Sequence, residues 1–112
     1  MSVVREEYID VDDALKRVGG NMALYKKLLG RFVDGDQLNM LEAALESGDT
    51  QEGSHAAHTV KGVAANLSLI KLRALSADIE LAVKSGEDYT PMLGQFKDAY
   101  EVTVQIITEI MA

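Results

Sequence analysis

The chain has 112 residues, 47% of them hydrophobic and 26% charged, which excludes wholesale disorder and a second catalytic domain, and we expect one domain over residues 1–112. A formal net charge of −7 argues against nucleic-acid binding, and the absence of Cys excludes disulfides, thiolate metal sites and a cysteine nucleophile. No apolar stretch approaches the roughly 20 residues of a membrane span, and residues 1–10 lack a signal-peptide pattern, so we expect a cytoplasmic protein without membrane association.

The first two predicted helices have clear start and stop signals. Asp10 or Asp12 can cap a helix that runs to Val18, where two consecutive glycines accept the positive φ angles of a helix end. Asn21 can cap a second helix, which reaches Val33 and has apolar residues at three- and four-residue spacing. Two more Asp residues and a Gly then interrupt the pattern.

The rest of the chain repeats the amphipathic pattern. The further helical segments are residues 37–46, 50–67, 69–84 and 91–112. Thr50 and Ser68 are candidate caps for the second and third of these segments. Pro91 fits the first turn of the last helix, where a missing N–H costs least.

These patterns predict an all-α fold. With turns of a few residues between the segments, four longer helices should pack as an antiparallel up-down four-helix bundle, and two short N-terminal helices should cover one end. A complete bundle needs no second copy to bury its apolar stripes, so we expect a monomer. The segment 69–84 has a second apolar face and should pack against more than one neighbour. This second face comprises Ile70, Ala74, Ala77 and Leu81.

Both histidines of the chain, His55 and His58, lie in the segment 50–67. On a helical wheel of about 100° per residue, seven small or apolar residues of this segment fall on one side and form a buried stripe, and His58 lies roughly 160° from its centre. The stripe comprises Gly53, Ala56, Ala57, Val60, Val63, Ala64 and Leu67. Its neighbours on the surface, three and four residues later, are Lys61 and Gly62. The wheel therefore predicts an exposed imidazole that a bulky partner can approach.

The run of residues 57–67, AHTVKGVAANL, resembles the signature A-H-x-L-K-G-x-A-x-x-L-G of histidine-containing phosphotransfer (HPt) domains. Further resemblance runs from Ile9 to Gly86 and so covers nearly the whole chain. Val60 replaces the usual Leu, and Ser68 stands where the family usually has Gly. The departure at Ser68 affects the turn after the motif helix.

The resemblance implies a phosphorelay carrier of two-component signalling. In such domains the imidazole Nε2 accepts a phosphoryl group reversibly from an aspartyl phosphate on a receiver domain, or from a kinase, and passes it to another receiver. By resemblance His58 is the phosphoacceptor, Lys61 supplies phosphoryl electrostatics, and Gly62 allows close approach of the partner. The expected partner is a receiver domain of a response regulator or of a hybrid histidine kinase.

The resemblance also implies a carrier rather than an enzyme. Mg²⁺ and the electrostatic stabilisation of transfer belong to the receiver, so no cofactor and no metal is expected on this chain. The sequence has no Gly-rich phosphate loop or Walker pattern, so ATP binding is not supported. Further partner contacts are expected around the acceptor, at Ser54, His55, Ala65, Ser68 and Lys71.

Two other interpretations remain open. Glu52 and His55 match the Glu-x-x-His spacing of di-iron bundles, although a second such motif is missing. The chain could instead be a helical protein-interaction module that is not phosphorylated. The carrier interpretation requires that the ring of His58 is neither sealed in the interior nor permanently engaged by an internal carboxylate.

Overall fold

The computed structural model describes residues 4–112, so residues 1–3 of the expected domain lie outside the described part of the chain. Every regular element in this range is helical, which confirms the predicted fold class. The elements are the 3-10 turn η1 (Arg5–Glu7) and the helices α1 (Val11–Arg17), α2 (Met22–Asp34), α3 (Gln37–Glu46), α4 (Thr50–Asn66), α5 (Ile70–Ser85) and α6 (Thr90–Met111). None of these helices is both long and apolar enough to cross a lipid bilayer.

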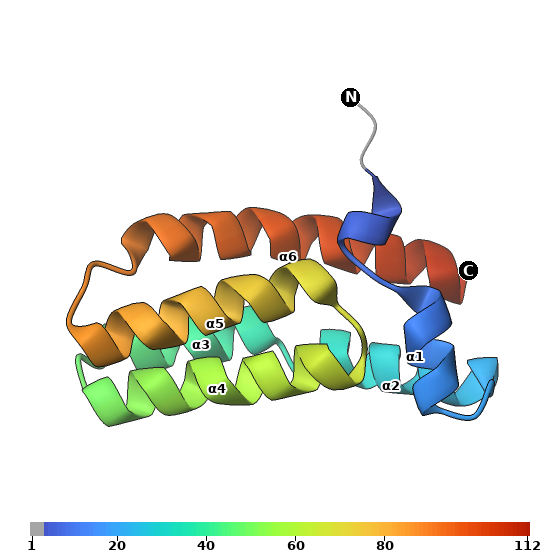
Figure 1. Ribbon diagram of the computed structural model, residues 1–112, viewed down its shortest axis with the longest axis horizontal. Coiled ribbons are helices and arrows are strands. Elements are labelled where there is room, and N and C mark those ends of the chain that lie inside the picture. The colour runs from blue at the N-terminus through green and yellow to red at the C-terminus, as the bar shows by residue number, and fades with distance from the viewer. Residues whose placement is uncertain (1–3) are drawn as a thin grey trace.

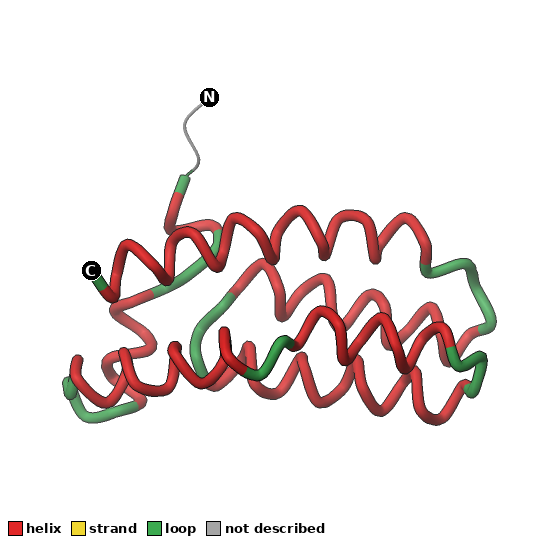
Figure 2. The backbone as a smooth tube through the Cα atoms, turned by 180° about the vertical axis from the view of Figure 1, so that it is seen from behind, coloured by secondary structure: helices red, strands yellow, loops and turns green. Residues whose placement is uncertain are grey.

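The longer helices lie roughly along the longest axis of the molecule, and the direction reverses from α3 to α4, from α4 to α5 and from α5 to α6 (Figure 1). α4 has its most extensive contacts with α5, and it also packs against α3. α6 packs on α5 and, farther along, on α2. Figure 2 shows the α3–α4 and α5–α6 loops at one end of the bundle and the α1–α2 loop at the other. α4 is therefore supported along its length by helices that precede and follow it.

The N-terminal helices differ from the predicted arrangement. The sequence predicts two short helices that cover one end, but α2 has 13 residues and α3 has 10. α3 continues from α2 along the long axis, and only η1 and α1 are short (Figure 1). The break between α2 and α3 falls at Asp36, which has a left-handed φ of 49°. Asp tolerates this conformation better than most residues, so the left-handed position of the break does not require a glycine.

Two predicted helix caps are confirmed. The Asp10 side chain accepts a hydrogen bond of 3.0 Å from the N–H of Asp13 at the start of α1. The Asn21 side chain accepts one of 3.0 Å from the N–H of Leu24 at the start of α2. The two glycines between these helices have positive φ, as the sequence predicts. The boundaries of α1 and α2 thus follow from local side-chain chemistry.

Two other predicted caps are wrong. Asp49 caps α4, because its side chain accepts hydrogen bonds from two N–H groups of the first turn, and Thr50 is already helical. Ser68 does not cap α5, because the cap position is one residue later. Ser68 instead has a left-handed φ of 57°, and its hydroxyl donates a hydrogen bond of 2.7 Å to Asp13 Oδ2. The turn after α4 is therefore tied to α1.

α5 packs against both α4 and α6. The face of α5 that includes Leu72 and Ile79 is fully buried. On the other face, Leu81 is 66% exposed and Ile70 is 42% exposed. The prediction of more than one neighbour is therefore confirmed, although Ile70 and Leu81 of the second apolar face stay exposed within residues 4–112.

Candidate functional site

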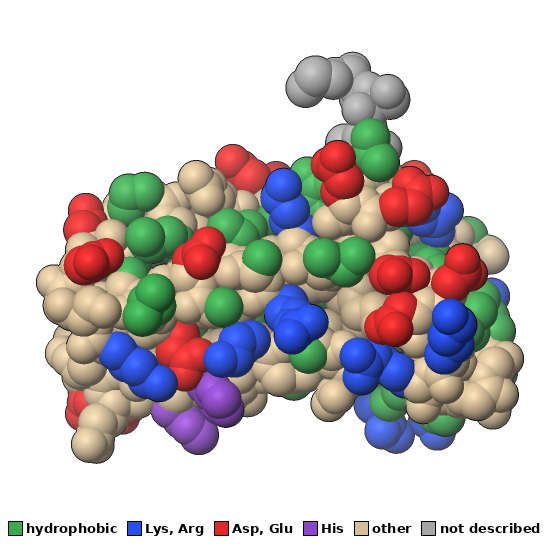
Figure 3. All heavy atoms as spheres, viewed as in Figure 1, with side chains coloured by type: hydrophobic (Ala, Val, Ile, Leu, Met, Phe, Trp, Pro, Cys, Tyr) green, Lys and Arg blue, Asp and Glu red, His purple; other side chains and the backbone are tan. Residues whose placement is uncertain are grey.

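His58 projects outward from the middle of α4. Its side chain is 64% exposed, whereas Ala57 and Val60 beside it in the sequence are fully buried. The wheel prediction of an exposed ring is therefore confirmed. Figure 3 shows both histidines together at the lower edge of the view, where Lys and Asp or Glu side chains adjoin them.

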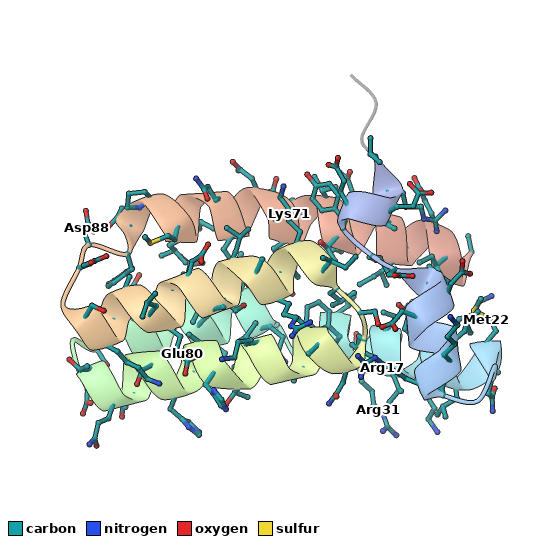
Figure 4. The ribbon with its side chains drawn as sticks, in the orientation of Figure 1. Arg17, Met22, Arg31, Lys71, Glu80 and Asp88 are labelled. Atoms are coloured by element: carbon teal, nitrogen blue, oxygen red, sulfur yellow. The ribbon has the colours of Figure 1, made fainter. Side chains whose placement is uncertain are left out.

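A buried carboxylate anchors one nitrogen of this ring. Glu80 of α5 has a side chain that is only 9% exposed, and its Oε2 lies 3.1 Å from His58 Nδ1. The Nζ of Lys61 lies 2.7 Å from Glu80 Oε1, and the Nζ of Lys84 lies 3.0 Å from Oε2. Figure 4 labels Glu80 on α5, with its side chain directed toward α4. One carboxylate thus connects the ring to two ammonium groups.

The charge of Glu80 fixes the proton on His58. The hydrogen bond from Lys61 is the largest influence and, with that from Lys84, lowers the pKa of Glu80 to about 2, although burial acts in the opposite direction. At neutral pH the carboxylate is ionised and can only accept hydrogen bonds. Nδ1 of His58 must therefore be the protonated nitrogen. In the neutral ring the lone pair then lies on Nε2.

This contact corrects one expectation from the sequence. The ring is not bare, because an internal carboxylate engages it through Nδ1. This contact does not block Nε2, because Nδ1 and Nε2 lie on different sides of the ring. No hydrogen bond within residues 4–112 occupies Nε2. Glu80 thus orients the ring through Nδ1 and leaves Nε2 accessible.

Lys61 and Gly62 lie one turn after His58. Lys61 is half-buried and is held by Glu80. Gly62 is exposed, and a Cβ built on it would meet no atom within 4 Å. The surface of α4 beyond the ring is therefore open. Two shallow depressions, of about 360 and 380 Å³, flank the His58–Glu80 pair, and Lys84 borders both of them.

The other residues expected at the partner contact are dispersed. Ser54 and His55 line the first depression together with His58, and Ala65 is half-buried farther along α4. Lys71 lies on α5 with its Nζ 5.6 Å from the centre of the Tyr8 ring, away from both depressions. Ser68 is only 6% exposed. Its hydroxyl donates to Asp13 of α1, and a direct contact of Ser68 with a partner stays a prediction.

The structure gives no support to the di-iron interpretation. Glu52 and His55 are both exposed on the first half of α4. Within residues 4–112, no group of three or more His, Asp or Glu side chains is placed so that it could hold a metal ion. The two residues therefore match only a short sequence pattern.

Sequence reasoning missed Glu80 and Lys84. Glu80 follows the buried Leu72 and Ser76 by eight and four residues, so it belongs to the buried stripe of α5. An acidic side chain on such a stripe needs a partner, and the only signal of one in the sequence is Lys84 four residues later. Its pairing with His58 depends on the register of α4 against α5, which the sequence pattern does not specify.

Comparison with known proteins agrees with this geometry. A family model described as "Hpt domain" matches residues 33–106, from the end of α2 into α6. Searches among curated proteins and among solved structures gave no match. Hpt domains are helical phosphocarrier modules of phosphorelay signalling that interact with receiver domains. Because the match covers well over half of the 112 residues, the chain belongs to the Hpt domain family.

Proposed function

We propose that this chain carries a phosphoryl group on Nε2 of His58, which it accepts from an aspartyl phosphate of a receiver domain and passes to another receiver. The observation that carries the proposal is the exposed ring whose Nδ1 is held 3.1 Å from the ionised Glu80. That contact leaves a lone pair on the outward nitrogen, which is the nucleophile that phosphoryl transfer needs.

The transfer balances without a proton donor or acceptor. The Nε2 lone pair forms the N–P bond while the P–O bond to the aspartyl carboxylate breaks, and the carboxylate leaves with the electron pair. Nδ1 keeps its proton, so the phosphorylated ring is positively charged beside the carboxylate of Glu80. In the reverse transfer the ring leaves as the neutral imidazole. Glu80 therefore stabilises the charge that forms in one direction and disappears in the other.

The two lysines complement the phosphoryl oxygens. Lys61 and Lys84 contribute two positive charges against the single negative charge of Glu80, which leaves a net positive charge beside the ring. Each charge interaction with a phosphoryl group is worth on the order of 1 kcal/mol in water, and more where a partner excludes solvent. In this proposal Mg²⁺ and the remaining stabilisation come from the receiver.

The proposal is tested with receiver domains that have been phosphorylated by radiolabelled acetyl phosphate. Wild type should take up the label and His58→Gln should not. The chain offers a matched control, because His55 is exposed on the same helix and is its only other histidine. His55→Gln should therefore retain the label. Label that survives in His58→Gln, or is lost only in His55→Gln, contradicts the proposal.

A further inference from the structure

A groove of about 700 Å³ lies between α1, α2 and the carboxyl half of α4. Its floor is apolar and includes the buried Phe32 and Leu67 and the half-buried Val63. Its rim carries the exposed side chains of Arg17 and Arg31. The groove is thus an open apolar surface with positive charge at its edge.

The groove and the phosphoacceptor share one side of the molecule. Around α4, Asn66 and Val63 of the groove are about 80° and 140° from His58 in one direction, while Lys61 is about 60° away in the other. Figure 3 shows the histidines and several Lys or Arg side chains along the same lower edge, and Figure 4 places Arg17 and Arg31 there. Glu80 and the groove therefore lie on opposite flanks of the ring.

The charge at the rim is opposite in sign to that of the chain. The net charge is −7, yet Arg31 makes no ion pair within residues 4–112. Arg17 is paired, because its Nε donates a hydrogen bond of 3.1 Å to Asp13 Oδ2. A positive rim around an apolar floor complements a protein segment that carries carboxylates beside apolar side chains.

Ser68 is connected to the arginine at the rim through Asp13. The Ser68 hydroxyl donates to Asp13 Oδ2 at 2.7 Å, and this is the oxygen that Arg17 also contacts. The hydrogen bond from Ser68 and, next, that from Arg17 hold the pKa of Asp13 below its usual value, so the carboxylate stays charged at neutral pH. The hydroxyl that replaces the usual glycine thus helps to fix the guanidinium at the rim.

We propose that the groove is a second contact site for the receiver, where it binds an acidic segment with apolar side chains, and that Arg31 and the Ser68–Asp13–Arg17 chain of hydrogen bonds select among receivers. The inference rests on the proposed function, because the same partner must reach His58. Asn66 lies about 12 Å along α4 from His58. A standard interface of about 800 Å² per partner covers both sites.

The test measures the initial rate of phosphoryl transfer to this chain against the concentration of a phosphorylated receiver domain, chosen as the fastest of a panel. Arg31→Glu should raise the half-saturating concentration about tenfold and leave the maximal rate within about twofold, because the change affects docking rather than chemistry. Lys97→Glu is the matched control, since it changes the net charge equally on α6 and should leave both parameters within about twofold.

A double-mutant cycle tests Ser68 as a positioning residue. Ser68→Ala should raise the half-saturating concentration about threefold in the wild-type background, because Arg17 loses its fixed geometry. In the Arg17→Ala background the same substitution should have no further effect. An equal rise in both backgrounds would show that Ser68 acts on the fold in general, and would overturn its assigned role.

A small phosphodonor separates an effect on docking from an effect on the acceptor itself. Phosphoramidate reaches His58 without docking, so Arg31→Glu should be labelled by it as fast as wild type. If Arg31→Glu is also labelled more slowly by phosphoramidate, the substitution acts on His58 itself and the groove assignment is overturned. An unchanged half-saturating concentration of the receiver would overturn it as well. If no receiver labels wild type, the proposed function fails and this inference fails with it.

Discussion

The buried carboxylate of Glu80 and the exposed ring of His58 meet across the α4–α5 interface, with Oε2 3.1 Å from Nδ1. The helix that carries the ring is thus not the only element that determines its reactivity. α5 fixes the position of the proton through a single oxygen, and two lysines keep that oxygen charged. The site is built by the packing of α4 on α5.

Glu80→Gln should lower the free energy of unfolding by about 1 kcal/mol at pH 7, because the hydrogen bonds to Lys61 and Lys84 lose their charge assistance. The pKa of Glu80 is about 2 in the folded protein against an ordinary value of 4.5, so its stabilisation is present above about pH 4.5 and disappears as the pH falls toward 2. Urea unfolding of both proteins between pH 7 and pH 2 measures this. A difference that grows as the pH falls would contradict the assigned ion pairs.

Glu80→Ala should slow phosphoryl transfer about tenfold, because the ring loses the acceptor that places its lone pair on Nε2. Glu80→Gln should be slowed less, since its amide oxygen can still accept from Nδ1. The ¹⁵N chemical shifts of His58 report the tautomer directly and should show protonated Nδ1 in wild type and a mixture in Glu80→Ala. The same tautomer mixture in wild type would refute the orienting role.

Gly62→Leu should block transfer from a receiver while the helix becomes more stable. The added side chain meets no atom of this chain, and replacing a helical glycine gains about 0.5 to 1 kcal/mol. Gly94 of α6 is the matched control, because it is also helical and open. Gly94→Leu should gain similar stability and transfer normally. Equal transfer by both variants would show that the surface beside His58 is not covered by the partner.

Ser68→Ala should lower the free energy of unfolding by about 1 kcal/mol, because it removes the hydrogen bond to Asp13. It also keeps a residue with a Cβ at a left-handed backbone φ of 57°. Ser68→Gly loses the same bond but relieves the backbone, which is worth about 1 kcal/mol, so it should be close to wild type. Thermal unfolding of the three proteins measures the order. Ser68→Gly below Ser68→Ala would contradict the strain assigned to this turn.

Much of this molecule could be predicted because the signals are local. The caps at Asp10 and Asn21 each depend on a side chain and a backbone group three residues apart. The outward direction of His58 follows from helical periodicity alone. The two predicted caps that are wrong each miss by one residue, because Asp49 rather than Thr50 caps α4, and the cap position of α5 is Leu69 rather than Ser68. Local sequence patterns therefore locate a helix boundary better than they identify which of two neighbouring residues caps the helix.

The rest could not be predicted because it depends on contacts between distant residues. Glu80 lies 22 residues from His58 and Ser68 lies 55 residues from Asp13. Both contacts require the packing of one helix on another, which a period of 3.6 residues does not define. The same holds for the exposed face of α5, where Leu81 has the periodicity of a core residue but no helix covers it.

The separation of the acceptor and the groove along α4 has a consequence for how such proteins diversify. The ring is prepared from the α5 side, whereas the groove and its arginines belong to α1 and α2. If the groove selects receivers as proposed, substitutions in the first segments of the chain should change which receiver is preferred and leave Nε2 of His58 unchanged. Partner preference could then be engineered in α1 and α2 without changes to the contact between His58 and Glu80.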